Sequence, residues 1–449
     1  MKIIIVGAGT IGKSLAQSLS KEDNEVYLIE SNEELASKVD EKLDVKVLVG
    51  SGIDPDILKL ANVSIADLVI AVTYSDETNF TICSLASLLG AKRLIARIRN
   101  IALSNLIHKR LLDPPINFPI DEIINPEEVT AKAIVKIVET PGAREVGDFV
   151  NGQILLRSFD VKKDSSLCGV KLGDLRSDKF PWPFLIVAIN REKEVIIPKG
   201  DTVIKESDRI YVLLPEASLR EFLFFIHERT KKASKVIVYG ATSTGSSIVQ
   251  YLQKEVSEVV LLEEDKHKSE DIAGKFKKAR IINGTASEKD ILIEAGVEVA
   301  DIFVAASNDD HSNLISAVLA KEMGAKTTII TMQKPDYLMI IDELDIDVII
   351  NPHLLAVEQI LGYVRGKSIS SVTKLLECDA EVLEFIAEPG SNITKKPLKN
   401  IRFPKNAIVG AISRGDEVIL GQGDTVVQVG DKVVIFCQEL AIKKVQGFF

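Results

Sequence analysis

Residues 1–12 of this 449-residue chain read MKIIIVGAGTIG, and residues 235–245 read KVIVYGATSTG. Each stretch is a run of β-branched and apolar residues that leads directly into a glycine-rich turn. This pattern is typical of a buried parallel strand followed by a helix. The first turn has the complete G-x-G-x-x-G spacing of a dinucleotide-binding fold, and the second turn keeps the first and last glycines. The two stretches therefore predict two related α/β units.

The duplication extends along the whole chain. EVYLIE, ending at Glu30, is matched by EVVLLE, ending at Glu263, and ADLVIAVTYSDETN, ending at Asn79, is matched by ADIFVAASNDDHSN, ending at Asn313. Farther on, KGDTVIKESD is matched by QGDTVVQVGD. A second half that repeats the first leaves no separate substrate domain. We therefore expect two tandem modules, each a Rossmann-like doubly wound parallel sheet followed by a small α+β domain.

Alternating β-branched runs and helical patterns place the elements of this fold. The strands of the first parallel sheet are predicted near 2–6, 25–29, 46–49, 67–72, 93–97 and 121–124, with helices beginning after Gly9, Glu33, Pro55, Glu77 and Asn100. Strands of the first small domain are predicted near 153–160, 184–190 and 208–214. The predicted boundaries are 1–126 and 235–352 for the parallel-sheet domains, 144–215 and 370–449 for the small domains, and 127–143, 216–234 and 353–369 for linker helices.

Composition excludes several classes of protein. With 46% hydrophobic and 27% charged residues the chain is globular, and its net charge of −10 argues against nucleic-acid binding. The four cysteines are scattered without a C-x-x-C pair, as in proteins of a reducing compartment. We find neither a signal peptide nor an apolar stretch long enough to cross a bilayer, so a cytosolic location is expected.

The first glycine turn carries the predicted nucleotide site. Gly7 permits the tight turn, Gly9 lets the backbone approach a pyrophosphate, and Gly12 allows the helix to pack closely on the strand. The turn residues Ala8, Thr10 and Ile11 complete the phosphate-binding loop at the helix N-terminus. Glu30 ends the second strand, where its carboxylate can accept hydrogen bonds from the adenine-ribose hydroxyls and would repel a 2′-phosphate. The sequence therefore favours NAD over NADP.

Other polar residues follow strands at the same edge of the predicted sheet. Ser51 follows the third strand, Thr73 and Tyr74 follow the fourth, and Arg97 ends the fifth. The Arg97 guanidinium could bind phosphate oxygens, or it could form a salt bridge with an acidic helix residue. The neighbouring Ser75 and Asp76 could contact a ligand or cap the next helix.

The second module departs from the first at two positions. It keeps Gly240, Gly245 and Glu263, but Thr242 replaces the middle glycine and Thr331 stands where Arg97 does. A β-branched side chain is expected to push a ligand away from the turn and to disfavour a positive φ angle. We expect weaker dinucleotide binding here, and the site holds either a smaller adenine nucleotide or nothing.

No catalytic or metal-binding pattern is found in the sequence. The five histidines do not repeat between the modules and form no H-x-x-x-H or H-E-x-x-H spacing. Neither a G-x-S-x-G turn nor a phosphate-binding P-loop motif occurs. We therefore predict no catalytic residues, no metal ligands and no enzymatic activity.

The tandem arrangement resembles one family over the entire chain. The residues that carry the resemblance are GAGTIG from Gly7, Glu30, TYSDETN from Thr73, ARIR from Ala96, INPE from Ile124 and the two GDTV motifs. They resemble the TrkA family of regulatory subunits of bacterial and archaeal Trk potassium-uptake systems, whose domains are called RCK or KTN and TrkA-C. Thr242 and Thr331 depart from that pattern and put the second site in doubt.

This resemblance implies a nucleotide-sensing regulatory subunit. It implies NAD(H) as ligand, with ATP or ADP as further ligands, and a homo-oligomer, most simply a tetramer that forms an eight-domain ring. The implied partner is a membrane potassium transporter subunit of the TrkH or TrkG type, to which the cytoplasmic ring attaches peripherally on the inner face of the membrane. The alternatives are the gating ring of a potassium channel or efflux system and an NAD-dependent oxidoreductase.

Overall fold

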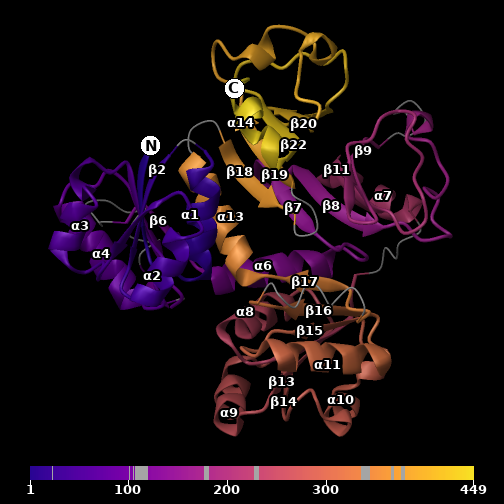
Figure 1. The fold of residues 1–449 in the computed structure, drawn as a ribbon. Helices are drawn as coiled ribbons and strands as arrows, with labels where there is room; N and C mark the ends of the chain where they lie inside the picture. Colours follow the sequence, from indigo (N-terminus) through magenta and orange to yellow (C-terminus); the bar gives the residue numbers. More distant parts are fainter. Residues whose placement is uncertain are drawn as a thin grey trace. The chain divides into compact units, whose positions relative to one another are not determined.

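The computed structural model (Figure 1) consists of two compact units, one formed by residues 1–130 with 351–364 and the other by residues 131–350 with 365–449. The residues described are 1–22, 24–100, 102–104, 106, 120–175, 182–226, 232–334, 344–365, 369–375 and 380–449. None of the helices within these ranges is both long enough and apolar enough to cross a bilayer. The helix predicted after Asn100 and the linker predicted at 216–234 lie partly outside the described residues.

The first parallel sheet has the strand order β3-β2-β1-β4-β5-β6. Its strands are β1 (Lys2–Val6), β2 (Glu25–Glu30), β3 (Lys46–Val49), β4 (Leu68–Ala71), β5 (Leu94–Arg97) and β6 (Glu122–Ile124). Its helices are α1 (Thr10–Ser20), α2 (Glu33–Asp40), α3 (Pro55–Leu60) and α4 (Asp76–Leu88). Because β1 pairs in parallel with both β2 and β4, the strand order reverses beside β1. Ligands of such sheets bind at this reversal, outside the carboxyl ends of the strands.

The second parallel sheet repeats this topology with the order β14-β13-β12-β15-β16-β17. Its strands are β12 (Lys235–Tyr239), β13 (Glu258–Glu263), β14 (Ala279–Asn283), β15 (Ile302–Ala305), β16 (Thr327–Thr331) and β17 (Val348–Ile350). Its helices are α8 (Ser243–Leu252), α9 (Lys266–Lys275), α10 (Lys289–Ala295) and α11 (Asp310–Glu322). The two sheets confirm the predicted α/β fold of tandem modules.

Helix α13 (Pro352–Arg365) follows the second parallel sheet in the chain but packs in the core of the first. Its buried residues Ala356, Ile360 and Leu361 share one hydrophobic cluster with Ile3 and Leu15. In Figure 1 the orange α13 accordingly lies beside the indigo α1. Helix α6 (Pro126–Glu139), which follows the first sheet, belongs from residue 131 onward to the other unit. We keep the sequence-derived boundaries as a proposed division of the chain, with α13 assigned to the first core.

Each module also contains a small antiparallel sheet, with the orders β10-β9-β11-β8-β7 and β18-β19-β22-β20-β21. The strands of the first are β7 (Val146–Phe149), β8 (Ile154–Asp160), β9 (Leu185–Arg191), β10 (Glu194–Ile196) and β11 (Arg209–Pro215). Those of the second are β18 (Ile369–Lys374), β19 (Ala380–Ile386), β20 (Ala407–Arg414), β21 (Glu417–Leu420) and β22 (Lys432–Gln438). Short helices α7 (Leu219–Phe225) and α14 (Ile442–Gln446) accompany them. Phe149 and Tyr211 share a core with Val382 and Phe436, so the two sheets bury a common apolar layer.

The repeated segments KGDTVIKESD and QGDTVVQVGD each end in a buried aspartate that stabilises a turn of the small domain. The buried Asp208 accepts hydrogen bonds from Nε and Nη2 of Arg191, both at 2.7 Å. In the second domain the buried Asp431 accepts the same two bonds from Arg414, at 3.0 and 2.8 Å. A bidentate guanidinium–carboxylate pair compensates for the loss of hydration of the buried charge. The aspartate that ends each repeated segment therefore has a structural explanation in both modules.

Candidate nucleotide-binding site

The glycine turn of the first module is shaped for close approach. Gly7 has a φ of +107°, and a Cβ there would lie 3.1 Å from the backbone nitrogen of Thr73. A Cβ at Gly12 would lie 1.8 Å from the carbonyl oxygen of Gly7, so any side chain would force α1 away from β1. Both positions therefore require glycine.

Gly9 has a different reason to be glycine. Its φ of −65° is open to any residue, but no atom lies within 4 Å of the position that a Cβ would take. Gly9 precedes α1, which has no side-chain cap. The first turn of α1 therefore has no capping side chain and open space beside its N-cap residue, and an anion site at a helix N-terminus requires both. Thr10 is exposed beside this space, whereas Ala8 and Ile11 are buried.

Glu30 lies beside the glycine turn and has a structural role there. Its Oε2 atom accepts a hydrogen bond from the Ala8 backbone N–H at 2.6 Å, and its Oε1 atom accepts one from the Asn32 N–H at 2.9 Å. The Oε1 atom also accepts from the Ser31 hydroxyl at 3.3 Å, so the second lone pair of Oε2 is the one that a ribose hydroxyl can use. The carboxylate thus joins the end of β2 to the turn after β1.

Asn79 joins the ends of β4 and β5. Its fully buried amide accepts from the backbone N–H and the hydroxyl of Thr73, at 2.9 and 2.7 Å. Its Nδ2 atom donates to the carbonyl oxygens of Thr73, at 3.2 Å, and of Arg97, at 2.9 Å. The predicted site residues Thr73 and Arg97 are therefore held together by a residue whose importance the sequence pattern did not reveal. Its recurrence as Asn313 was the available signal.

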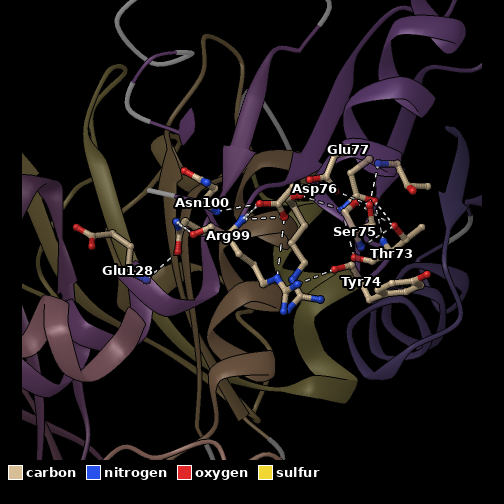
Figure 2. Close-up of polar contacts among 12 residues, drawn as sticks. Thr73, Tyr74, Ser75, Asp76, Glu77, Arg99, Asn100 and Glu128 are labelled. Atoms are coloured by element: carbon tan, nitrogen blue, oxygen red, sulfur yellow. Dashed lines mark hydrogen bonds and ion pairs between the residues drawn. The ribbon is translucent and has the colours of Figure 1, made fainter. Parts of the chain in front are cut away.

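The residues after Thr73 form a network that gives Ser75 and Asp76 structural roles (Figure 2). Ser75 is the N-cap of α4, since its side chain accepts from the Thr78 N–H at 3.1 Å. The Asp76 carboxylate accepts from the backbone N–H groups of Arg99, at 3.0 Å, and Asn100, at 2.9 Å. The exposed Tyr74 contributes its carbonyl oxygen, which accepts from Arg99 Nη2 at 2.8 Å. Capping and loop fixation explain these residues without a ligand.

Arg97 differs from its neighbours because its Nε atom is buried and has no hydrogen-bond partner. The same is true of Oε2 of Glu127, on the first turn of α6. Burial lowers the pKa of the Arg97 guanidinium, and the negative charge of Glu127 opposes that shift. Unsatisfied buried polar atoms are rare in folded proteins and call for a partner. Glu127 was not among the predicted site residues, and only its place in the INPE motif distinguished it.

Ser51 follows β3 at the same edge, but it is exposed, and its hydroxyl accepts from the Ile53 N–H at 3.4 Å. The contacts of Glu30 with Ala8, and of Asn79 with Thr73 and Arg97, thus gather most of the predicted residues around the strand reversal. Direct ligand contacts by any of them remain a proposal.

The second module has the same frame. Gly240 has a φ of +100°, and a Cβ at Gly245 would lie 1.9 Å from the Gly240 carbonyl oxygen. Glu263 accepts from the Ala241 N–H at 2.7 Å, as Glu30 does from Ala8. Thr242 has a φ of −71°, so the expectation that threonine is disfavoured there by a positive φ is wrong. The backbone at this position is extended in both modules, and only the side chain differs.

A cavity of about 490 Å³ lies at the opposite edge of the second sheet, beside the amino ends of β15, β16 and β17. Its charged groups pair with one another. Arg144 bonds to Asp160 at 2.7 Å and to Asp347 at 3.1 Å, and Lys326 bonds to Asp301 at 2.6 Å. We assign no ligand to it. Within the described residues no group of three or more histidine, cysteine or acidic side chains is arranged to hold a metal ion.

The matches to known protein families occur twice along the chain, once in each module. The TrkA-N domain model matches residues 3–126 and 236–352, and the TrkA-C domain model matches residues 156–226 and 382–449. The chain belongs to the TrkA family. This TrkA-family chain is 31% identical to the "Trk system potassium uptake protein TrkA" of Haemophilus influenzae, over 98% of this chain and 96% of that protein. It is also 31% identical to a "TrkA homolog 1" of Methanosarcina mazei over the full length of both.

Solved structures share the fold of this TrkA-family chain. The GsuK RCK domain matches with a TM-score of 0.62 at 15% identity, covering all of this chain and 94% of that one. The GsuK channel bound to NAD matches with a TM-score of 0.62 at 14% identity, covering all of this chain and 78% of that one. At these identities the likeness establishes the fold alone.

Proposed function

We propose that this chain is the nucleotide-sensing regulatory subunit of a Trk-type potassium uptake transporter, and that NAD(H) bound in the first module is its signal. The observation that carries the proposal is the uncapped glycine turn of α1, held by Glu30, in a chain that matches the TrkA-N and TrkA-C domains twice. Full-length relatives named as Trk potassium uptake proteins support the transport role.

Each part of the dinucleotide has a proposed partner in the first module. The diphosphate lies against Gly7 to Gly12, where the first-turn N–H groups of α1 can donate to its oxygens. The adenine ribose lies against Glu30, whose charge disfavours the 2′-phosphate of NADP. The guanidinium of Arg97, with its unpaired Nε, donates to a phosphate or ribose oxygen. We retain Ser51 and Tyr74 as peripheral contacts.

ATP and ADP are the competing ligands, because they share the adenosine and diphosphate of NAD(H). NAD(H) is favoured because the first turn has the complete G-x-G-x-x-G spacing of a dinucleotide site, with Glu30 beside it. The second module keeps a glycine turn with an acidic residue, formed by Gly240, Gly245 and Glu263. This turn could bind an adenosine.

The proposed mechanism is thermodynamic linkage. A nucleotide that binds one arrangement of an oligomeric ring more tightly than another shifts the equilibrium by that difference in binding free energy. We propose a homotetramer, in which the eight parallel-sheet domains form the ring. The ring attaches at the cytoplasmic face of the membrane to a TrkH- or TrkG-like transporter subunit, which responds to its rearrangement.

Two other functions share parts of this evidence. The gating ring of a potassium channel has the same fold, but the channel structures are 14–15% identical, whereas the uptake proteins are 31% identical over nearly the whole chain. An NAD-dependent oxidoreductase would need a proton donor and a substrate pocket beside the nicotinamide. The second half of this chain is instead a second copy of the nucleotide domain.

The test combines binding with transport. Calorimetric titration of the full-length protein should give tighter binding of NADH or NAD than of NADP, and NADH absorbance should stay constant with small carbonyl compounds. Adding the protein and NADH to vesicles that contain the transporter subunit should change the potassium flux. A chain that binds no adenine nucleotide, or that consumes NADH at enzyme-like rates, would contradict the proposal.

A further inference from the structure

The hydroxyl of Thr242 joins the first turn of helix α8 to the end of strand β15 in the second module. It accepts a hydrogen bond from the backbone N–H of Gly245 at 3.1 Å and donates one to the carbonyl oxygen of Ala306 at 2.7 Å. Gly245 is on the first turn of α8, and Ala306 directly follows β15. Because β12 and β15 are the strands at which the sheet order reverses, the hydroxyl spans the place where a dinucleotide's diphosphate would lie.

The first module provides a matched comparison. The backbone bond that joins the two strands is the same in both modules, from Val72 N to Val6 O at 2.9 Å and from Ala306 N to Tyr239 O at 2.8 Å. Gly9 and Thr242 also have nearly the same conformation, with φ and ψ of −65° and −175° and of −71° and 174°. The backbones of the two turns are therefore equivalent, and the turns differ at this position by the threonine side chain.

The Thr242 side chain removes both the free N–H donor and the open space that a diphosphate would occupy. The hydroxyl takes up the Gly245 N–H, which otherwise would be a free donor at the helix N-terminus. The side chain also fills the space that is open beside Gly9. In addition, Thr331 replaces Arg97, and its hydroxyl accepts from Asn313 Nδ2 at 3.2 Å. The second module thus lacks both the Arg97 guanidinium and a free N–H donor at the position of Gly245.

We propose that Thr242 prevents dinucleotides from binding in the second module. Each chain then binds one NAD(H), in the first module, and the second module takes part in the ring without binding NAD(H) itself. The inference rests on the proposed function for its ligand, because it takes NAD(H) as the molecule that the first module holds. It identifies Thr242, together with Thr331 in place of Arg97, as the determinant of the number of sites in each chain.

Reciprocal exchange of the two residues tests the inference in the full-length protein, with NADH as the probe and calorimetry as the readout. The wild type should bind one NADH per chain. Thr242→Gly combined with Thr331→Arg should bind two, and the conservative control Thr242→Ser should still bind one. Gly9→Thr should lose at least tenfold in affinity, because a threonine there can reach Val72 O and Gly12 N as Thr242 reaches their counterparts. Its melting temperature should not fall, since the new hydroxyl caps α1.

Two equal sites in the wild type would overturn the inference. A single NADH site in the Thr242→Gly, Thr331→Arg protein would also overturn it. Unchanged NADH affinity in Gly9→Thr would overturn it as well, and this variant is not expected to be less stable than the wild type. No binding by the wild type would instead reject the proposed function. Appearance of a site in the Thr242→Gly, Thr331→Arg protein would still support closure by Thr242.

Discussion

The Oε2 atom of Glu30 lies 2.6 Å from the backbone nitrogen of Ala8, so the carboxylate proposed to hold the ribose also fixes the glycine turn. Glu263 and Ala241 have the same relationship at 2.7 Å in the second module, where the Thr242 side chain stands at the proposed diphosphate position. The Glu30–Ala8 and Glu263–Ala241 hydrogen bonds can therefore be compared directly. Both fix a glycine turn, but only the first lies beside the proposed NAD(H) site.

Replacing Glu30 with alanine should weaken NADH binding at least tenfold, because charge-assisted hydrogen bonds to the ribose contribute about 1.5–3 kcal/mol each. Glu263→Ala is the matched control. It removes the equivalent bond to the turn but should leave NADH affinity unchanged, so the difference between the variants isolates the ribose contact. Calorimetry of both variants checks this. An equal loss in both, or tight NADP binding by the wild type, would show that Glu30 is misassigned.

Asn79→Ala should lower both stability and NADH affinity. It removes a fully buried amide and leaves buried partners on Thr73 and Arg97 unsatisfied, at a cost of about 1–3 kcal/mol. Asn313→Ala should lower stability similarly, because Asn313 bonds to the Ser307 N–H at 2.9 Å and to the Thr331 carbonyl oxygen at 3.0 Å. It should spare NADH binding. Thermal melting and calorimetry of the two variants measure these effects, and an unchanged melting temperature would refute the role given to the amide.

Acid should weaken the first small domain through Asp160. Burial raises the pKa of this carboxyl, but the guanidinium groups of Arg209, at 2.6 Å, and Arg144, at 2.7 Å, outweigh burial and leave the pKa below the ordinary aspartate value of 3.8. A depressed folded-state pKa stabilises the fold fully above the unfolded-state value, and that stabilisation is lost as the pH falls through the folded-state pKa. Asp160→Asn should therefore be less stable than the wild type near pH 6, and the difference should shrink below about pH 3.8. Melting curves across this range test it, and a difference independent of pH would contradict the assignment.

Assembly is expected to involve the helical segments 79–91 and 313–325. Leu88, near the end of α4, is 83% exposed, and Ile315 on α11 is 57% exposed, although the other faces of both helices cover the sheets. Covering such apolar side chains contributes roughly 1.5–3 kcal/mol each. Leu88→Asp and Ile315→Asp should therefore shift the tetramer toward smaller species in sedimentation. A wild type that is monomeric at micromolar concentration would refute assembly, and unaffected variants would move the interface elsewhere.

The parallel sheets could be predicted closely, because buried parallel strands are continuous apolar runs, and the turns after β1 and β12 could be predicted from their glycines. The strands β7 and β10 were missed, because VGDF and EVI are too short to show alternation. The place of α13 was also unforeseen. Periodicity shows that a helix has an apolar face, but it does not show which sheet that face covers. In the site, the unpaired Nε of Arg97 and the bridge made by Thr242 depend on contacts between distant residues, and a local pattern contains no such information.

The packing of α13 has a consequence for synthesis on the ribosome. The first parallel sheet leaves the ribosome early, but Ala356, Ile360 and Leu361, which complete its core, are made only after the whole second sheet. At typical elongation rates the intervening ~230 residues take roughly 10–50 s. Throughout that interval the apolar surface that α13 covers has no α13 to cover it on the nascent chain. The domain that is made first is therefore completed only when residue 364 has been added.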